Sequence, residues 1–165
     1  MRALGDRIML IGCGGSGKSV LTSKLAQKTG LPPFYLDREK QGFNTADEWL
    51  NVLHQLAEYD RWILDGNMGV MHMDHRMARA TSILFLDFSR ARCLYRGVMR
   101  NLRQLFSRRV REDGCPAKLD WTFIAWVWNF NKKQRPQILE KMTAYPEKSI
   151  ILRNPRDVEK LLSEL

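Results

Sequence analysis

Eight residues near the start of the chain have the types and the spacing needed to bind phosphate groups. Residues 12–19 read GCGGSGKS, which fits the pattern G-x-x-x-x-G-K-S. Glycines let backbone N–H groups converge on phosphate oxygens, and a helix that begins there adds the positive end of its dipole. In such a loop Lys18 reaches the β- and γ-phosphates, and the Ser19 hydroxyl is a ligand of Mg²⁺. The motif therefore predicts a site for ATP and Mg²⁺.

The segments on either side of the motif decide whether it is a phosphate-binding loop or a glycine-rich turn with a chance lysine. Residues 8–11 are apolar and suit a buried strand, and residues 20–30 read as a helix. Strand, glycine loop and helix is the context that favours the phosphate-binding loop. The residues of this segment predicted to contact the nucleotide are Gly12, Gly14, Gly15, Ser16, Gly17, Lys18, Ser19 and Val20.

The rest of the chain alternates short apolar strands with helical segments. Further strands are expected at residues 34–36, 62–64, 82–86 and 149–152. Helices are expected at 45–58 (capped by Thr45), at 71–79, from Arg90 onward, at 120–145 with a kink or split at Pro136, and at 155–164. This alternation predicts one α/β domain, residues 1–165, with five parallel strands whose carboxyl ends bind the ligand.

Three aspartates are expected at the ends of strands, and each is a candidate for the chemistry. Asp65 and Asp87 follow apolar strands, where a carboxylate could reach the water shell of Mg²⁺ beside Ser19. Asp65 is preferred, through water, because the Asp-Gly turn gives a close approach to the phosphates; Asp87 is the alternative. Asp37 either binds the hydroxyl of a phosphate acceptor or pairs with a nearby basic residue.

Positive charge is concentrated in the second half of the chain. The formal net charge is +9, and residues 90–111 contain eight arginines and no acidic residue. Arg92, Arg96, Arg100 and Arg103 share one helix face by their spacing. Without acidic neighbours this face is predicted to be part of a lid over the triphosphate, although a solvated basic face is the alternative. Arg100 and Arg109 are the arginines expected to act on the transferring phosphate.

Other features limit the setting and the class of protein. Three cysteines without metal-like spacing indicate a reducing compartment, and we expect a cytoplasmic protein. No apolar run is long enough to cross a membrane. Aromatic residues at helical spacing, from Trp121 through Trp126 to Phe130, are interpreted as the core side of the long helix.

The sequence also resembles a known family. It is similar to small kinases of the adenylate and shikimate kinase type, and more closely to the bacterial proteins called DNA topology modulation proteins, described as adenylate kinase-related. The resemblance covers nearly the whole chain. Its stretches are GCGGSGKS (12–19), YLD (35–37), WILDGN (62–67), ILFLDFSRARCLYR (83–96), EDGCP (112–116), WVWNFNKKQRP (126–136) and IILRNP (150–155).

The resemblance implies a nucleoside-monophosphate-kinase fold, with strand order 2-3-1-4-5, an acceptor-binding flap around residues 37–60 and a short lid around 104–118. It implies that Arg96 and Arg100 contact the nucleotide and that Asn154 borders the adenine. Adenylate kinases carry an arginine in a DGFPR stretch, whereas residues 65–69 of this chain read DGNMG.

Two functions follow from these observations. The first is an ATP- and Mg²⁺-dependent phosphotransferase with a small acceptor, such as a nucleotide or a nucleoside. The alternative is a nucleic-acid-associated ATP-binding protein that modulates DNA topology. The sequence has no helix-turn-helix, zinc site or RNP pattern, so any binding to nucleic acid is expected to be weak and non-specific.

Overall fold

A computed structural model describes residues 4–107 and 121–165 of the chain. Within these residues five strands form one parallel sheet in the order β2-β3-β1-β4-β5, as predicted. The strands are β1 (Arg7–Gly12), β2 (Pro33–Tyr35), β3 (Trp62–Asp65), β4 (Ser82–Leu86) and β5 (Ser149–Leu152). All strands run the same way, so their carboxyl ends lie along one edge of the sheet.

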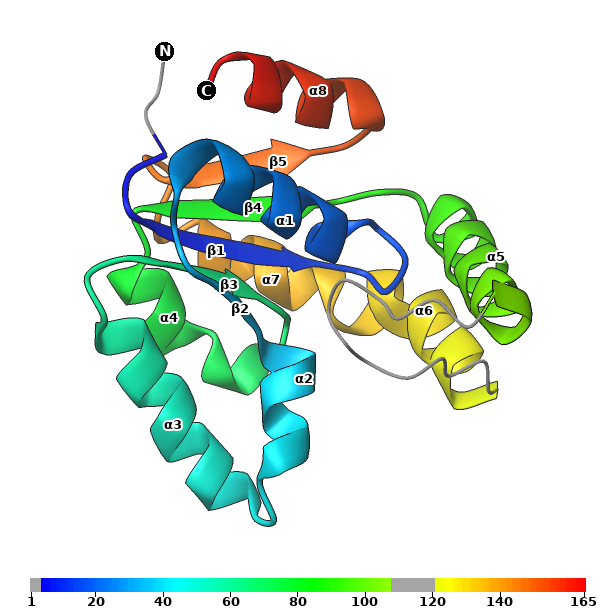
Figure 1. Cartoon of the computed structure of the whole chain (residues 1–165), viewed down its shortest axis with the longest axis horizontal. Coiled ribbons are helices and arrows are strands. Elements are labelled where there is room, and N and C mark those ends of the chain that lie inside the picture. Colours follow the sequence, from blue (N-terminus) through cyan, green and yellow to red (C-terminus); the bar gives the residue numbers. More distant parts are fainter. Residues whose placement is uncertain (1–3, 108–120) are drawn as a thin grey trace.

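Helices connect the strands and cover both faces of the sheet (Figure 1). They are α1 (Lys18–Thr29), α2 (Leu36–Glu39), α3 (Ala46–Glu58), α4 (Asp74–Arg79), α5 (Arg90–Ser107), α6 (Trp121–Lys133), α7 (Arg135–Met142) and α8 (Pro155–Ser163), with 3₁₀ turns η1 (Lys40–Gly42) and η2 (Val70–His72). Among the helices of the described residues, none combines the length and the apolarity that a membrane crossing needs.

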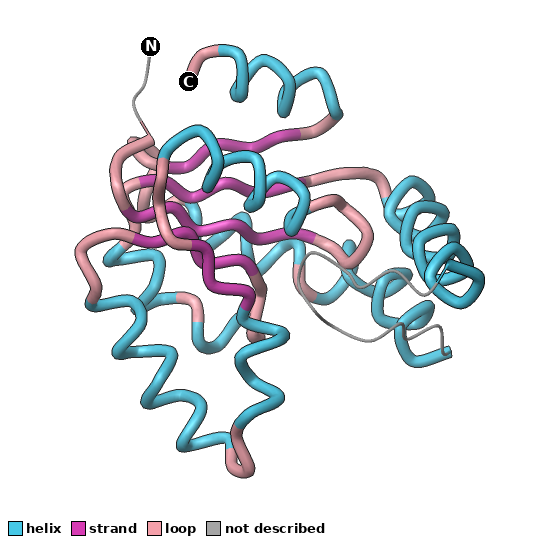
Figure 2. The backbone as a smooth tube through the Cα atoms, in the orientation of Figure 1, coloured by secondary structure: helices cyan, strands magenta, loops and turns pink. Residues whose placement is uncertain are grey.

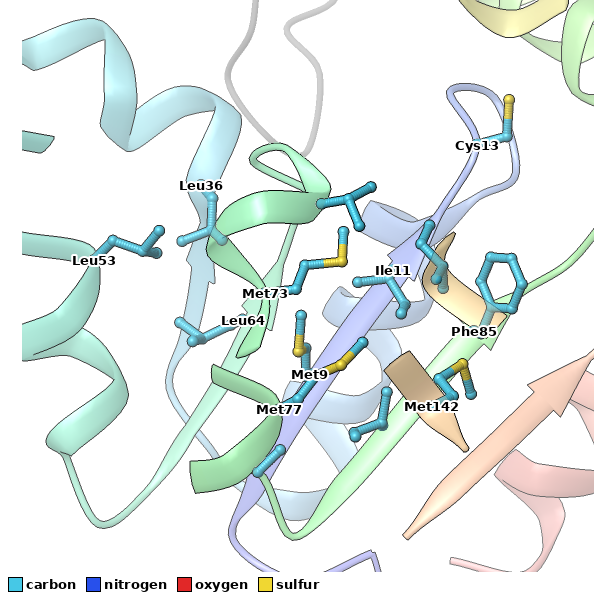
Figure 3. Packing of buried hydrophobic residues seen from close by; sticks show 14 of the residues in the cluster. Met9, Ile11, Cys13, Leu36, Leu53, Leu64, Met73, Met77, Phe85 and Met142 are labelled. Atoms are coloured by element: carbon cyan, nitrogen blue, oxygen red, sulfur yellow. The ribbon is translucent and has the colours of Figure 1, made fainter. Parts of the chain in front are cut away.

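The two faces of the sheet have separate cores, because alternate side chains of a strand point to opposite faces. Ile8 and Leu10 of β1 pack with α1 and α8. Met9 and Ile11 of the same strand pack with α3, α4, α6 and α7. Figure 3 shows the second core, in which Cys13 follows Ile11 at the end of β1. The central strand is therefore buried on both faces, which fixes the point at which residues 12–19 leave the sheet.

Most of the predicted elements are confirmed, and the differences lie at their ends. The helix after the motif begins at Lys18, so the last two residues of the motif lie in its first turn. The predicted cap at Thr45 is confirmed, since its side chain accepts a hydrogen bond from the backbone N–H of Glu48. The long segment is split as predicted, with Pro136 in the first turn of α7.

Two predictions from the sequence were wrong in position. The second strand ends at Tyr35, so Asp37 lies in the first turn of α2 and not at the end of a strand. The aromatic residues of α6 are only partly core. Phe130 is buried and Phe123 packs against the core, but Trp126 is 36% exposed and Trp121 is 83% exposed.

The burial of β4 gives a test of this fold. Phe85 is fully buried in the central part of the sheet, whereas Tyr95 on α5 is 66% exposed. Phe85→Ala should lower the free energy of unfolding by about 3–5 kcal/mol, measured by urea denaturation, because it opens a cavity in a packed core. Tyr95→Ala is the control and should change it by about 0.5 kcal/mol or less. Equal losses in the two variants would contradict the placement of β4.

Candidate functional site

The glycine-rich segment forms a loop between the carboxyl end of β1 and the amino end of α1. Gly17 is the N-cap of α1, with φ of 98°, a conformation that favours glycine. The loop also bends back on itself, because the backbone N–H of Ser16 donates to the carbonyl of Cys13. The positive end of the α1 dipole therefore faces the space that the loop encloses. Figure 2 shows this loop on the edge of the sheet that faces α5 and α6.

Lys18 lies across the loop. Its ammonium group donates to the carbonyl oxygens of Gly12, at 3.0 Å, and of Cys13, at 3.2 Å. Both acceptors are neutral. The ammonium group would be stabilised if an anion replaced these carbonyls, since hydrogen bonds between two charged groups are stronger than those to a neutral acceptor.

Helix α5 packs directly on the loop. A Cβ atom at Gly15, whose φ is +80°, would lie 2.1 Å from the carbonyl oxygen of Cys93, so only glycine fits at this position. A Cβ atom at Gly17 would lie 3.3 Å from a terminal nitrogen of Arg96. The structure therefore brings Arg96 to the loop, as the helical spacing suggested. Arg100, one turn further along α5, is half-buried, and Arg109 lies outside the described residues, as does the predicted lid beyond Ser107.

The contact between loop and helix includes two thiols. Cys13 and Cys93 are both buried, and their thiols donate to backbone carbonyls, of Val127 at 3.9 Å and of Phe88 at 3.8 Å. The neighbouring thiol of Cys93 and burial raise the pKa of Cys13 well above its ordinary value. Cys13 is therefore a neutral packing residue.

The two candidate aspartates differ in their partners. Asp87 makes a bidentate ion pair with Arg135 of α7, with distances of 2.7 and 2.8 Å. This hydrogen bond raises the pKa of Arg135. Asp65 is 4% exposed and is aligned with Leu10 of β1 on one side and Tyr35 of β2 on the other. Asp87 is therefore paired with α7, and Asp65 lies at the carboxyl edge of the sheet, at the end of a strand next to β1.

The remaining predicted site residues lie on, or cap, three different helices. Val20 is 43% exposed on α1. Asp37 is exposed on α2. Asn154 caps α8 in a reciprocal arrangement with Asp157, in which its side chain accepts from the backbone N–H of Asp157 at 3.1 Å. The Asn154 side chain therefore caps α8, a role that was not predicted from the sequence, which placed Asn154 near the adenine.

Two residues that the sequence did not single out contact the site. Asn67 is 8% exposed, and its carboxamide both accepts from the N–H of Gly12 and donates to the carbonyl of Gly12, each at 2.9 Å. Arg76 of α4 is fully buried and donates to the carbonyls of Gly66, at 2.9 Å, and of Asn67, at 2.7 Å. Burial lowers the pKa of Arg76 to about 10, so this side chain remains charged at neutral pH. Neither residue belongs to a recognisable spacing pattern.

Helix α6 borders the loop with aromatic side chains. A Cβ atom at Gly14 would lie 2.9 Å from the rings of both Phe123 and Trp126. Beside this contact α6 carries a groove of about 340 Å³. The groove is lined by Thr122, Ala125, Trp126, Asn129, Phe130, Lys133 and Gln134. The surface next to the phosphate-binding loop is therefore aromatic, with amide and ammonium groups at its margin.

Comparison with known proteins identifies the fold. No protein-family model matches the chain. No curated protein sequence matches it either.

Solved structures match over almost the whole chain. A shikimate kinase from Bacteroides thetaiotaomicron is 18% identical, with a TM-score of 0.63 over 96% of this chain and 95% of that one. A shikimate kinase from Acinetobacter baumannii, solved in complex with shikimate, is 16% identical, with a TM-score of 0.64 over 97% and 90%. A gluconokinase from Sinorhizobium meliloti is 15% identical, with a TM-score of 0.52 over 99% and 94%. The chain therefore has the fold of the small phosphate-loop kinases of the shikimate kinase type.

Proposed function

We propose that this chain is an ATP- and Mg²⁺-dependent phosphotransferase that moves the γ-phosphate to a small acceptor, such as a nucleotide or a nucleoside. The observation that carries the proposal is the meeting of two cations, Lys18 and Arg96, on a glycine loop at the start of a helix. Loop amides, helix dipole and both cations attract phosphate oxygens. The fold shared with shikimate kinases and a gluconokinase supports the same class of reaction.

The chemical role of the residues is positioning and charge stabilisation. Phosphoryl transfer needs an in-line arrangement of acceptor and leaving group, with positive charge around the transferring oxygens. Lys18 would exchange its two carbonyl partners for the β- and γ-phosphate oxygens. Arg96 would contact the phosphates from the α5 side, and Arg100 and Arg109 would stabilise the charge that develops during transfer. No covalent intermediate on the protein is required.

Ser19 and Asp65 are the residues that would hold Mg²⁺. A hydroxyl and a carboxylate are hard oxygen donors, and Mg²⁺ in such sites keeps several waters and binds few protein groups directly. Ser19 lies in the first turn of α1, and Asp65 ends the strand next to β1. The ion would neutralise charge between the β- and γ-phosphates. Asp65 is preferred to Asp87 because Gly66 follows it, and an Asp-Gly turn allows a close approach to the phosphates.

The acceptor would approach from the side of α2, which follows β2 at the carboxyl edge of the sheet. Asp37 would bind or deprotonate the hydroxyl of the acceptor. Its position on α2 places it at the start of the predicted flap. The groove beside Trp126 offers a second wall next to the loop. Residues 65–69 lack the arginine that adenylate kinases use for a monophosphate, which favours an acceptor other than AMP.

One observation favours the alternative, a nucleic-acid-associated ATP-binding protein. The guanidinium of Arg90 lies 4.5 Å from the centre of the Trp128 ring, and that ring is 50% exposed. Exposed aromatic rings beside arginines are typical of surfaces that bind single-stranded nucleic acid. However, the binding of a triphosphate is enough to explain the cations on the phosphate loop.

The first test of the kinase proposal combines an acceptor screen with Lys18→Ala. Nucleosides, nucleoside monophosphates and small hydroxy acids are supplied with Mg²⁺-ATP, and ADP release is measured above the background without acceptor. At least one acceptor should stimulate release, and Lys18→Ala should reduce it about 100- to 1,000-fold, as for a lost charge-stabilising donor. Unchanged ATP affinity and unchanged turnover in this variant would contradict the site.

The second test separates the two aspartates. Asp65→Asn should weaken the Mg²⁺ dependence of ATP binding about tenfold in a calorimetric titration, with little effect on metal-free ATP. Asp87→Asn is the matched control. It should lower stability by about 1 kcal/mol, through loss of the partly exposed pair with Arg135, and leave the Mg²⁺ dependence unchanged. A larger loss of Mg²⁺ dependence in Asp87→Asn than in Asp65→Asn would assign Mg²⁺ to Asp87.

The third test separates kinase from nucleic-acid binder. Arg100→Ala should lower turnover more than ATP affinity, because the charge it stabilises is greatest in the transition state. Binding to duplex and single-stranded DNA should be weak and lost steeply as salt rises. DNA affinity that survives physiological salt and disappears in Arg100→Ala, together with an acceptor screen without a hit, would favour the alternative.

A further inference from the structure

The hydrogen-bond ladder between β3 and β1 is continued by a side chain where the main chain turns away. The last main-chain contact runs from the N–H of Gly66 to the carbonyl of Leu10, at 3.2 Å. Asn67 then turns its carboxamide to Gly12 and makes the two contacts of 2.9 Å described above. A carboxamide offers one acceptor and a donor side by side, so it can take the place of a peptide group. The first residue of the phosphate loop is therefore held by Asn67.

Within the described part of the chain, two side chains donate to the carbonyl of Gly12. One is the Asn67 carboxamide, and the other is the ammonium of Lys18, at 3.0 Å. Gly12 is buried, so its carbonyl depends on protein donors. When Lys18 moves to a phosphate, one of these donors leaves. A buried carbonyl without any donor is costly, and Asn67 is the donor that remains.

Asn67 is itself held in place by Arg76. The buried guanidinium of Arg76 binds the carbonyls of Gly66 and Asn67 and also reaches the carbonyl of His72, at 3.3 Å. The backbone beyond Asn67 is unusual, since Met68 has a φ of 50° and Gly69 a φ of 75°. Non-glycine residues adopt such a φ only when their surroundings hold them there. Arg76 thus keeps the carboxamide of Asn67 aimed at Gly12.

We propose that Asn67 is a positioning residue of the phosphate loop, which keeps Gly12 hydrogen-bonded while Lys18 turns from the loop carbonyls to the phosphates of the nucleotide. Arg76 holds Asn67 in place for this role. The inference rests on the proposed function, because the nucleotide is the second partner of Lys18. It also ties the segment of residues 66–69, on the acceptor side, to the nucleotide side of the site.

The other end of β1 provides a matched control for a contact that is only structural. The hydroxyl of Thr81 accepts from the N–H of Arg7, at 2.9 Å, and lies 2.9 Å from the carbonyl of the same residue. Like the Asn67 contact, this is a side-chain contact to the N–H and carbonyl of one β1 residue, at the end of the strand away from the loop; the hydroxyl also lies 3.0 Å from the carbonyl of Leu4. Thr81→Val removes it with little change of volume.

The experiment measures the dissociation constant of Mg²⁺-ATP by calorimetry, and the melting temperature, for wild type, Asn67→Ala, Asn67→Asp and Thr81→Val. All three variants should melt at lower temperature. Only the Asn67 variants should bind ATP more weakly, by about tenfold, because the Gly12 carbonyl then lacks a donor once Lys18 leaves. Asn67→Asp keeps an acceptor for the N–H of Gly12, loses the donor and adds a negative charge. If Asn67→Ala does not fold, Asn67→Asp replaces it in the double-mutant cycle below, because repulsion of the phosphates would persist in the Lys18→Ala background and the effect of the lost donor would not.

A double-mutant cycle with Lys18→Ala isolates the proposed role. In the Lys18→Ala background Asn67→Ala should cause no further loss of ATP affinity, since no ammonium has to leave Gly12; a merely structural role would give additive losses. If the wild type binds ATP, two results would contradict the role of Asn67 and leave the proposed function intact. One is additive losses in the cycle, and the other is equal ATP affinity in Asn67→Ala and Thr81→Val. Failure of the wild type to bind ATP would overturn the proposed function, and this role with it.

Discussion

A phosphate-binding loop must leave most of its backbone N–H groups available for a ligand, and the rest of the structure depends on this constraint. Residues committed to a helix or sheet cannot do so, so the loop is stabilised from outside. Asn67 holds Gly12, the backbone of α5 packs against Gly15, and two aromatic rings of α6 pack against Gly14. Each support comes from a different segment of the chain. The glycines that suit phosphate therefore also allow these supports to approach.

The architecture was predictable from the sequence because its determinants are local. Alternation of apolar strands and amphipathic helices gave the parallel sheet, and a motif followed by a helical segment gave the loop. Thr45 with Glu48 marked a helix start correctly, since a cap is a contact between residues three apart. Asp37 was misplaced because the boundary between a three-residue strand and a short helix depends on tertiary contacts, which propensity does not encode.

The supports of the site were not predictable, because they join distant segments through single contacts. Asn67 and Gly12 are 55 residues apart, and Arg135 and Asp87 are 48 apart. A lone asparagine or arginine has no periodicity or spacing that a sequence pattern could show. Arg76 would have been read as a surface residue, since arginine is rarely buried, yet it is fully buried on the carbonyls of one loop. Such residues become visible only when the topology brings their segments together.

The charge of α5 gives the last link between fold and function. Residues 90–111 contain eight arginines and no acidic residue. In the structure Arg90 lies on the Trp128 ring and Arg92 on the Phe88 ring, contacts that hold a guanidinium in place without neutralising its charge. Arg96 then projects onto the loop that already holds Lys18. Positive charges concentrated in this way repel one another and lower the stability of the free protein. An anion with several negative charges removes that repulsion on binding, which is why a triphosphate suits this site better than a neutral ligand does.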